Sequence, residues 1–199
     1  MKLITFEGVE GVGKSTQIAL VKAWLEDQNF TVKLIREPGS TKFGEQIRDL
    51  LLSNESNFSY QTELLLMFSA RAEMIKIHLT NAAEDFVLCD RYYHASIAYQ
   101  GYGRGLSLNF IDELIAGIKC PTPDLTILYD LDVKQGFQRK ASDTKDRIES
   151  SGLEFFERVR SGYVHLSQTL QEVHLIDASD SEEEIHNKTM AQITSTLSL

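Results

Sequence analysis

The segment 8–15 reads Gly-Val-Glu-Gly-Val-Gly-Lys-Ser and combines closely spaced glycines with a lysine and a serine. Glycines let the backbone curl so that successive N–H groups point at phosphate oxygens. Lys14 adds a positive charge for the outer phosphates of a nucleoside triphosphate, and the Ser15 hydroxyl suits Mg²⁺. The segment joins an expected strand to an expected helix, whose N-terminus also favours anions. The residues predicted to bind the nucleoside triphosphate are Gly8, Val9, Glu10, Gly11, Val12, Gly13, Lys14, Ser15 and Thr16.

A second polar group follows the apolar run 86–89, which is typical of a buried strand. Asp90 places a carboxylate at the end of this strand, so it is the second predicted Mg²⁺ ligand. The alternative is a structural aspartate that caps the next helix. Arg91 is well placed to contact a phosphate. Asp130 and Asp132, at the end of a later strand, are alternative candidates for the metal ligand.

Leu64, Phe68 and Arg71 are spaced four and three residues apart on a long expected helix and therefore share one face. An aromatic ring beside a guanidinium suits a flat heterocycle, which the ring can stack on while the arginine bonds a carbonyl oxygen. The spacing alone favours the simpler interpretation that Phe68 is a core residue.

Short apolar runs alternate with longer helical patterns along the chain. Strands are expected at 3–6, 31–35, 86–89, 125–131 and 173–176, and helices at 16–28, 43–52, 59–83, 108–118 and 153–170, with Ser59 as a cap. A last helix is expected to open at the acidic run 179–184, which is read as a cap. This alternation predicts an α/β fold with a parallel sheet between helices. Ligands of such sheets bind beyond the carboxyl ends of the strands, so 8–15, 36–41, 90–93 and 130–132 should converge.

Composition indicates one soluble domain over residues 1–199, because hydrophobic residues make up 42% of the chain. The formal charge of −9 argues against general nucleic-acid binding, so an anionic ligand must be held by local donors.

No stretch is apolar enough for a membrane span, and the N-terminus does not resemble a signal peptide. Two cysteines, Cys89 and Cys120, give no disulfide framework, and Cys89 is expected to be buried. We expect a cytoplasmic protein.

A phosphate loop by itself does not define the reaction. A GTPase usually adds Asn-Lys-x-Asp, but Asn187 and Lys188 are followed by Thr189 and Met190 in the last helix. The compact chain fits a small phosphotransferase better. Another nucleotide or nucleoside kinase on the same scaffold and a non-catalytic nucleotide sensor are the alternatives.

Six segments resemble bacterial thymidylate kinases in order and spacing: FEGVEGVGKSTQ, REPGST, FSARAE, DRYYHASIAYQGYGRG, PDLTILYDLDV and DRIE. The resemblance implies a P-loop NTPase-type three-layer sandwich with a five-stranded parallel sheet. It also implies a homodimer that transfers the γ-phosphoryl group of ATP to dTMP with Mg²⁺, in dTTP synthesis.

The resemblance also implies roles for single residues. Phe68 would stack on thymine, Arg71 would bond the base, and Gln100 would lie near its polar edge. Tyr99 would pack beside the sugar and disfavour a 2′-hydroxyl, and Glu10 would lie near the 3′-hydroxyl. The residues implied to bind dTMP are Glu10, Arg36, Glu37, Pro38, Phe68, Arg71, Arg91, Ser96, Tyr99 and Gln100.

The chain departs from the family pattern at two places. Ser40 replaces a usual glycine and must tolerate a backbone shape that glycine adopts easily. His94 and Ala95 replace an aspartate and a serine, which removes a carboxylate and a hydroxyl near the acceptor. His94 is read as a surface replacement; the alternative is a new contact to the substrate phosphate.

Phosphoryl transfer needs positioning and positive charge more than covalent chemistry, and a phosphate acceptor needs no strong base. This phosphate loop carries no arginine, so the resemblance implies that arginines of a lid at approximately 139–149 supply the charge. Arg139 and Arg147 join Lys14 and Arg91 in the predicted catalytic set; the alternative is that 139–147 is a solvated charged loop.

Overall fold

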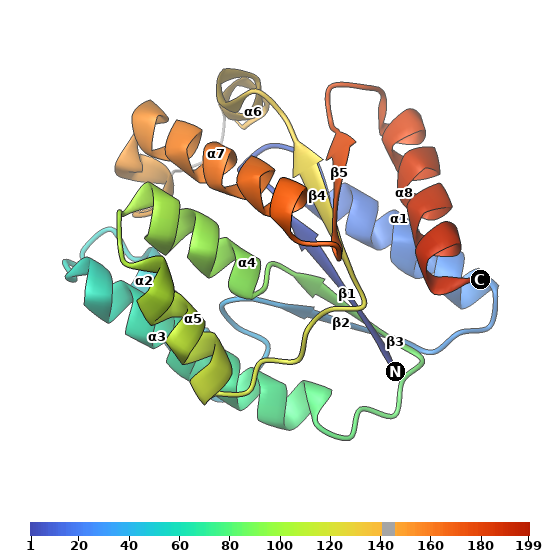
Figure 1. Cartoon of the computed structure of the whole chain (residues 1–199), viewed down its shortest axis with the longest axis horizontal. Helices are drawn as coiled ribbons and strands as arrows, with labels where there is room; N and C mark the ends of the chain where they lie inside the picture. The colour runs from blue at the N-terminus through green and yellow to red at the C-terminus, as the bar shows by residue number, and fades with distance from the viewer. Residues whose placement is uncertain (141–145) are drawn as a thin grey trace.

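The computed structural model describes residues 1–140 and 146–199. It contains a five-stranded sheet in which every strand pair is parallel, in the order β2-β3-β1-β4-β5 (Figure 1). The strands are β1 (Lys2–Glu7), β2 (Val32–Arg36), β3 (Phe86–Asp90), β4 (Leu125–Asp130) and β5 (Val173–Asp177). The predicted α/β fold and its five strands are therefore confirmed, with each boundary within one residue of its expected place.

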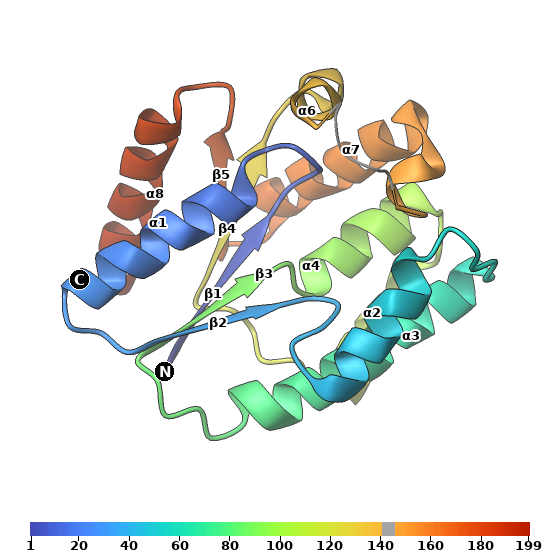
Figure 2. The ribbon, with the colours of Figure 1, turned by 180° about the vertical axis from the view of Figure 1, so that it is seen from behind.

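Helices cover both faces of the sheet. They are α1 (Lys14–Asp27), α2 (Lys42–Leu52), α3 (Tyr60–Met74) with its π-helical continuation η1 (Ile75–Leu79), α4 (Tyr93–Ser96) with the π-helical η2 (Ile97–Gly103), α5 (Leu108–Gly117), α6 (Val133–Arg139), the 3₁₀ turn η3 (Glu149–Ser151), α7 (Leu153–Thr169) and α8 (Glu182–Leu197). Helices α1 and α8 lie on one face, whereas α4 and α7 lie on the other (Figures 1 and 2). Because α2, α3 and α5 lie together beyond α4, the molecule has a second helical layer on that side (Figure 1).

The strands at the centre of the sheet are buried on both faces, which explains their nearly continuous apolar sequences. In β1, Leu3, Ile4 and Phe6 are at most 2% exposed. One polar pair is buried with them: Thr5 and Thr126, which are register partners on β1 and β4, share a hydrogen bond of 2.7 Å. Since both hydroxyls are satisfied, the pair does not weaken the core.

Helix ends follow the local signals that the sequence carries. Ser59 caps α3 by accepting a hydrogen bond from the Thr62 N–H group, as expected. The acidic run also forms a cap, because Ser181 and Glu184 make a reciprocal capping box at the start of α8. The expected helix over 59–83 is shorter, since its helical structure ends at Leu79.

Besides the 3₁₀ turn η3, two helical segments of the described chain lie outside the helix ranges expected from the sequence. One runs through α4 and η2, over residues 93–103, and the other is α6. At the start of α6, Asp132 Oδ1 accepts hydrogen bonds from the N–H groups of Lys134 and Gln135 at 3.0 and 3.2 Å. Asp132 is therefore a helix cap and does not line the cavity described below, and its role as an alternative metal ligand stays a prediction.

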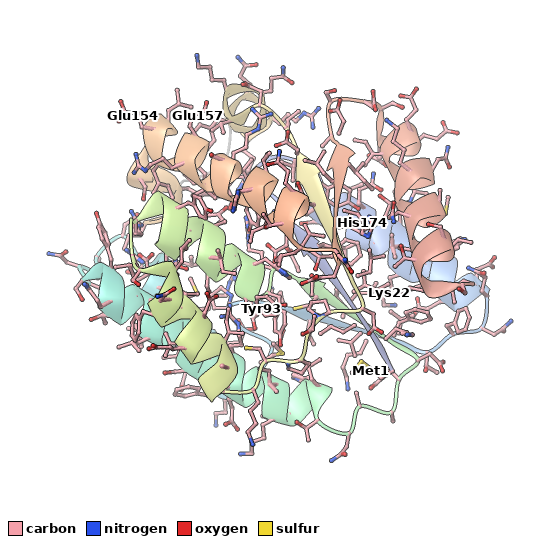
Figure 3. The ribbon with its side chains drawn as sticks, in the orientation of Figure 1. Met1, Lys22, Tyr93, Glu154, Glu157 and His174 are labelled. Carbon is pink, nitrogen blue, oxygen red and sulfur yellow. The ribbon has the colours of Figure 1, made fainter. Side chains whose placement is uncertain are left out.

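His94 on α4 corrects another expectation, because it is buried rather than on the surface. Its side chain is only 1% exposed. The imidazole ring lies 4.2 Å from the ring of Tyr93, and Nε2 lies 3.8 Å from Glu172 Oε1. Tyr93 itself lies between the sheet and the helices, while Glu154 and Glu157 point outward from α7 (Figure 3). His94 therefore belongs to the packed interior and does not line the cavity described below.

Within the described residues, the helices are too short or too polar to cross a membrane.

Candidate active site

The phosphate loop follows β1 and ends where α1 begins, as the sequence predicts. Gly8, Gly11 and Gly13 adopt φ values of 136°, 76° and 88°, in the region that side chains rarely enter. There is also no room for a side chain at two of them. A Cβ atom on Gly8 would lie 2.4 Å from the Tyr129 carbonyl oxygen, and one on Gly11 would lie 2.1 Å from that of Gly136. Gly8 and Gly11 are therefore required by both conformation and space, and Gly13 by conformation alone.

Lys14 opens α1 and is 8% exposed. Its Nζ donates hydrogen bonds to the carbonyl oxygens of Gly8 and Val9 at 3.2 and 3.3 Å. Burial, followed by the charge of Arg91, lowers the pKa of Lys14. The ammonium therefore lies next to the phosphate loop. Because it is shielded from water, its attraction for a bound phosphate would be strong.

A cavity of about 400 Å³ lies at the carboxyl ends of the strands. Lys14 and Arg71 both line it, so the phosphate loop and the expected base-binding residues share one cavity. The predicted residues that line it are Glu10, Lys14, Ser15, Arg36, Glu37, Pro38, Arg71, Asp90, Arg91, Ser96, Tyr99 and Gln100. This convergence is the geometry that the parallel sheet implies.

Asp90 and Ser15 lie together on the wall of this cavity. The Oδ1 atom of Asp90 is buried and has no hydrogen-bond partner among the described residues, so it fits a cation ligand. By contrast, Asp130 is held by Arg160, whose Nε and Nη2 donate to its two oxygens at 2.7 and 2.8 Å. The Asp90 carboxylate and the Ser15 hydroxyl could coordinate a hard cation such as Mg²⁺. Phosphate or water oxygens would have to complete its coordination shell.

Arg91 connects the phosphate loop to the rest of the cavity. Its Nη2 lies 2.6 Å from Glu10 Oε1, and its Nη1 donates to the Gly8 carbonyl oxygen at 2.8 Å. The guanidinium also lies 4.9 Å from the ring centre of Tyr99, whose hydroxyl donates to Glu10 at 3.2 Å. Desolvation raises the pKa of Glu10, but the charges of Arg91 and Lys14 outweigh it and hold this pKa at about 2. Glu10 is therefore ionised at neutral pH.

Arg71 is anchored on α3 with its side chain 2% exposed. Its Nε donates to Glu37 Oε2 at 2.8 Å, and its Nη2 donates to Ser96 Oγ at 3.0 Å. Its third nitrogen, Nη1, is buried and has no partner among the described residues. Phe68 packs under the guanidinium, 4.6 Å from its centre, but is 3% exposed and does not line the cavity. The core interpretation of Phe68 is thus compatible with its burial, and its contact with a base stays a prediction.

The cavity also contains residues that sequence reasoning missed. Arg48 on α2 donates to the Pro38 carbonyl oxygen at 3.0 Å and lines the cavity with Arg36. Burial, followed by the charge of Arg36, lowers the pKa of Arg48. Two neighbouring guanidinium groups on one wall favour an anion there. The sequence signal was weak, because an arginine on an amphipathic helix is ordinarily solvated.

The expected lid is only partly described, because 141–145 lie outside the described residues. Of the remainder, Lys140, Asp146, Ile148 and Glu149 line the cavity. Neither predicted lid arginine does. Arg139 donates to the Ala178 carbonyl oxygen at 3.2 Å, and Arg147 donates to the Leu51 carbonyl oxygen at 2.8 Å. Their catalytic role stays a prediction.

The remaining predicted residues form the backbone of the phosphate loop and the first turn of α1. They are Gly8, Val9, Gly11, Val12, Gly13 and Thr16, and they lie beside the cavity rather than among its lining residues. A loop of this kind binds phosphate through its backbone N–H groups, so the side chains need not face the cavity.

Comparison with known proteins agrees with this geometry. A sequence model described as thymidylate kinase matches residues 6–189. A thymidylate kinase from Vesicomyosocius okutanii subsp. Calyptogena okutanii is 47% identical over 92% of this chain and 92% of its own length. One from Chlorobaculum parvum is 41% identical over 96% of this chain and 94% of its own.

The fold has a matching solved structure. The crystal structure of thymidylate kinase from Ehrlichia chaffeensis superposes with a TM-score of 0.80 at 28% identity, over 96% of this chain and 98% of that one. The family model covers most of the chain, and the phosphate loop shares its cavity with a second group of arginines. This chain therefore belongs to the thymidylate kinase family and is a nucleoside monophosphate kinase.

Proposed function

We propose that this protein transfers the γ-phosphoryl group of ATP to dTMP, giving dTDP and ADP, with Mg²⁺ as the metal ion. The observation that carries the proposal is the single cavity shared by Lys14 and Arg71. Donor and acceptor phosphates bound in one cavity can be brought close together, which is the main requirement of phosphoryl transfer. The product would serve the synthesis of dTTP.

The donor side is assigned to the phosphate loop. Backbone N–H groups of residues 8–15 would hold the phosphates, and Lys14 would neutralise the charge on the transferring group. Ser15 and Asp90 would hold Mg²⁺, which would supply positive charge to stabilise the phosphates. The buried Oδ1 of Asp90, which has no hydrogen-bond partner in the part of the chain that the structure describes, supports this assignment.

The acceptor side is assigned to arginines that line the same cavity. Arg36, Arg48 and Arg91 would surround the phosphate of dTMP. Tyr99, held against Arg91, would pack beside the sugar, and Glu10 would lie near the 3′-hydroxyl. The acceptor phosphate is largely dianionic near neutral pH, so its own oxygen can attack without a strong general base.

The base is assigned to the floor formed by α3 and η2. Among the described residues, Nη1 of Arg71 has no partner and suits a carbonyl oxygen of the base, whereas Glu37 and Ser96 fix the other nitrogens of this guanidinium. Gln100 lies on the same cavity wall. Phe68 supports Arg71 from behind, whether or not it also contacts the base.

A coupled assay with ATP and Mg²⁺ tests the proposal directly. We expect dTMP to be the preferred acceptor among dTMP, dUMP, dCMP, AMP and GMP, because the cavity offers polar groups for one pyrimidine edge. Preference for a purine monophosphate would defeat the assignment of the base site. Tight ATP binding without turnover of any acceptor would instead favour a nucleotide sensor.

We also propose that two copies of the chain form a homodimer in the cytoplasm. Helices α2, α3 and α5 leave large apolar side chains on the surface, including Leu50, Leu65 and Leu108, each at least 40% exposed. Apolar side chains gathered on neighbouring helices favour a protein–protein contact. Cys89 and Cys120 are free thiols, which is compatible with a reducing compartment.

A further inference from the structure

Glu63 is a buried carboxylate on α3, with a side chain 1% exposed. It is not among the residues that line the described cavity. Three side chains donate hydrogen bonds to it: Gln100 Nε2 at 2.9 Å, Arg104 Nε at 3.3 Å and Arg147 Nη2 at 2.7 Å. The carboxylate therefore joins α3 to η2 and to the segment that follows the expected lid.

This environment keeps Glu63 ionised at neutral pH. Desolvation by burial is the largest single influence and raises the pKa of Glu63. The hydrogen bond from Gln100, the charge of Arg104 and the hydrogen bond from Arg147 together leave this pKa below its usual value. An ionised carboxylate can only accept hydrogen bonds.

The charge of Glu63 dictates how the Gln100 side chain is oriented. Since Glu63 only accepts, the Gln100 amide must present its NH₂ group to it, as observed. The other end of the amide, Oε1, has no hydrogen-bond partner in the described part of the chain, and Gln100 lines the cavity. Gln100 Oε1 is therefore the hydrogen-bond acceptor that this residue presents to the cavity.

Arg71 provides the complementary group, because its buried Nη1 is a donor with no partner within residues 1–140 and 146–199. Together the two residues offer one donor and one acceptor. Thymine and uracil carry an acceptor, O4, next to a donor, N3–H, and can satisfy both. Cytosine has the reverse order, an amino donor at C4 and an acceptor at N3, and would leave buried polar groups unpaired, which is costly.

We propose that Glu63 is a positioning residue which holds the oxygen of the Gln100 amide toward the bound base and so selects 4-oxo pyrimidine monophosphates over 4-amino ones. This inference rests on the proposed function and deepens it, because it assigns part of the base selectivity to a residue outside the cavity. Glu63 acts through Gln100 and touches no substrate.

The test is the variant Glu63→Gln, compared with the wild type on dTMP, dUMP and dCMP. A neutral amide at position 63 both donates and accepts, so it no longer dictates which end of Gln100 faces the base. We expect the ratio of kcat/KM for dTMP to that for dCMP to fall at least about tenfold, the effect of one hydrogen bond. The ratio for dTMP to dUMP should not change, because both bases carry the same 4-oxo edge.

Two further variants separate positioning from general stability. Arg104→Met removes a second partner of Glu63 but keeps an apolar stem between Tyr60 and Phe155, and it should leave the dTMP to dCMP ratio unchanged. The double variant Glu63→Gln with Gln100→Glu places a carboxylate at position 100, which offers the base only acceptors. It should restore the preference for dTMP that Glu63→Gln loses.

The outcomes are distinct. An active Glu63→Gln enzyme with the wild-type dTMP to dCMP ratio, or an equal loss on all three substrates, would overturn the inference alone. A wild-type protein that does not phosphorylate dTMP would overturn the proposed function and the inference with it.

A measurement on the wild type covers the case in which Glu63→Gln fails to fold. The side-chain NH₂ signal of Gln100, identified by its loss in Gln100→Glu, should exchange slowly with solvent in a ¹H–¹⁵N spectrum, because it is bonded to a buried carboxylate. Rapid exchange would overturn the inference.

Discussion

Arg91 joins the phosphate loop to the acceptor side of the cavity through three contacts. It pairs with Glu10, donates to the Gly8 carbonyl oxygen and stacks on Tyr99. Its own backbone has a φ of 67°, an unusual conformation for a residue with a side chain. The surrounding contacts hold the residue in this conformation, so its guanidinium is already in place before a ligand arrives.

Because Glu10 forms an ion pair with Arg91, its contribution to the stability of the folded state depends on pH. The pKa of Glu10 in the folded protein is about 2, below the ordinary value of 4.5. A depressed carboxyl pKa stabilises the folded state above about pH 4.5, and this contribution disappears as pH falls toward 2. We expect the free energy of unfolding of Glu10→Gln to be lower than that of the wild type by up to about 3 kcal/mol at pH 6.

Urea unfolding between pH 6 and pH 3 checks this prediction. The difference between wild type and Glu10→Gln should narrow steadily below pH 4.5, because the wild-type carboxyl then takes up a proton on unfolding. A difference that stays constant down to pH 3 would contradict the assigned ion pair.

Ser40 shows that a single departure from the family pattern can be accommodated locally. Its φ is 65°, so the expected glycine-like backbone is confirmed. Its hydroxyl accepts a hydrogen bond from the Arg36 N–H group at 2.7 Å, and its own N–H group donates to Glu45 Oε1 at 2.8 Å. These hydrogen bonds offset the roughly 1–2 kcal/mol that a left-handed conformation costs.

At the scale of elements, α6 is packed directly against the phosphate loop. Gly136 on α6 and Gly11 in the loop approach so closely that neither can carry a Cβ atom without meeting the backbone of the other segment. A Cβ atom on Gly136 would lie 2.4 Å from the Glu10 carbonyl oxygen. The shape of the loop therefore depends on a helix that is distant in the sequence.

We expect Gly136→Ala to displace the phosphate loop, because the contact is with backbone rather than with a flexible side chain. The KM for ATP should rise about tenfold or more, and the free energy of unfolding should fall by about 1–3 kcal/mol. Steady-state kinetics and urea unfolding measure the two effects. Gly117→Ala on α5 is the matched control, because nothing lies within 4 Å of its added Cβ. Equal kinetics for the two variants would show that the loop tolerates the displacement.

The expected lid provides a second prediction at this scale. Arg139 ends α6 and donates a hydrogen bond to the Ala178 carbonyl oxygen. If it supplies charge to the transferring phosphoryl group, Arg139→Ala should lower kcat at least about 100-fold and change the KM for dTMP little. A wild-type kcat would remove Arg139 from the catalytic set.

At the scale of the whole molecule, the charge of the cavity differs from that of the whole chain, because cationic side chains gather there beside several carboxylates. The formal charge is −9, yet Lys14, Arg36, Arg48 and Arg91 line one cavity. Fixed donors within a cavity act at short range and with less screening than surface charges. This local arrangement of donors agrees with the proposed binding of two anionic nucleotides by a protein whose total charge is negative.

The proposed homodimer is tested at the exposed apolar side chains of α2, α3 and α5. Leu65 is 46% exposed on α3, so a charge there should not disturb the core. We expect the wild type to have twice the chain mass of 22.5 kDa by light scattering, and Leu65→Arg to shift toward the monomer. Exposed Lys22→Glu on α1 serves as the control. A wild-type monomer at micromolar concentration would reject the dimer.

The order of strands and helices could be predicted from the sequence because its signals are local. Apolar runs, helix caps at Ser59 and Ser181, and the glycines of the phosphate loop each act within a few residues. The shared cavity followed from topology, since the carboxyl ends of parallel strands meet at one edge. By contrast, α4 with η2 was missed, because its many aromatic and glycine residues carry little helical signal.

Only the tertiary structure decided which side chains are buried and which of them meet. His94, the pairing of Asp130 with Arg160, and the position of Arg48 depend on segments far apart in the chain. Glu63 gave no sequence signal either, because its three partners lie 37, 41 and 84 residues away. The sequence by itself determined the phosphate loop and the sheet. The environment of each charge was decided by packing, because burial and pairing arise only when distant elements come together.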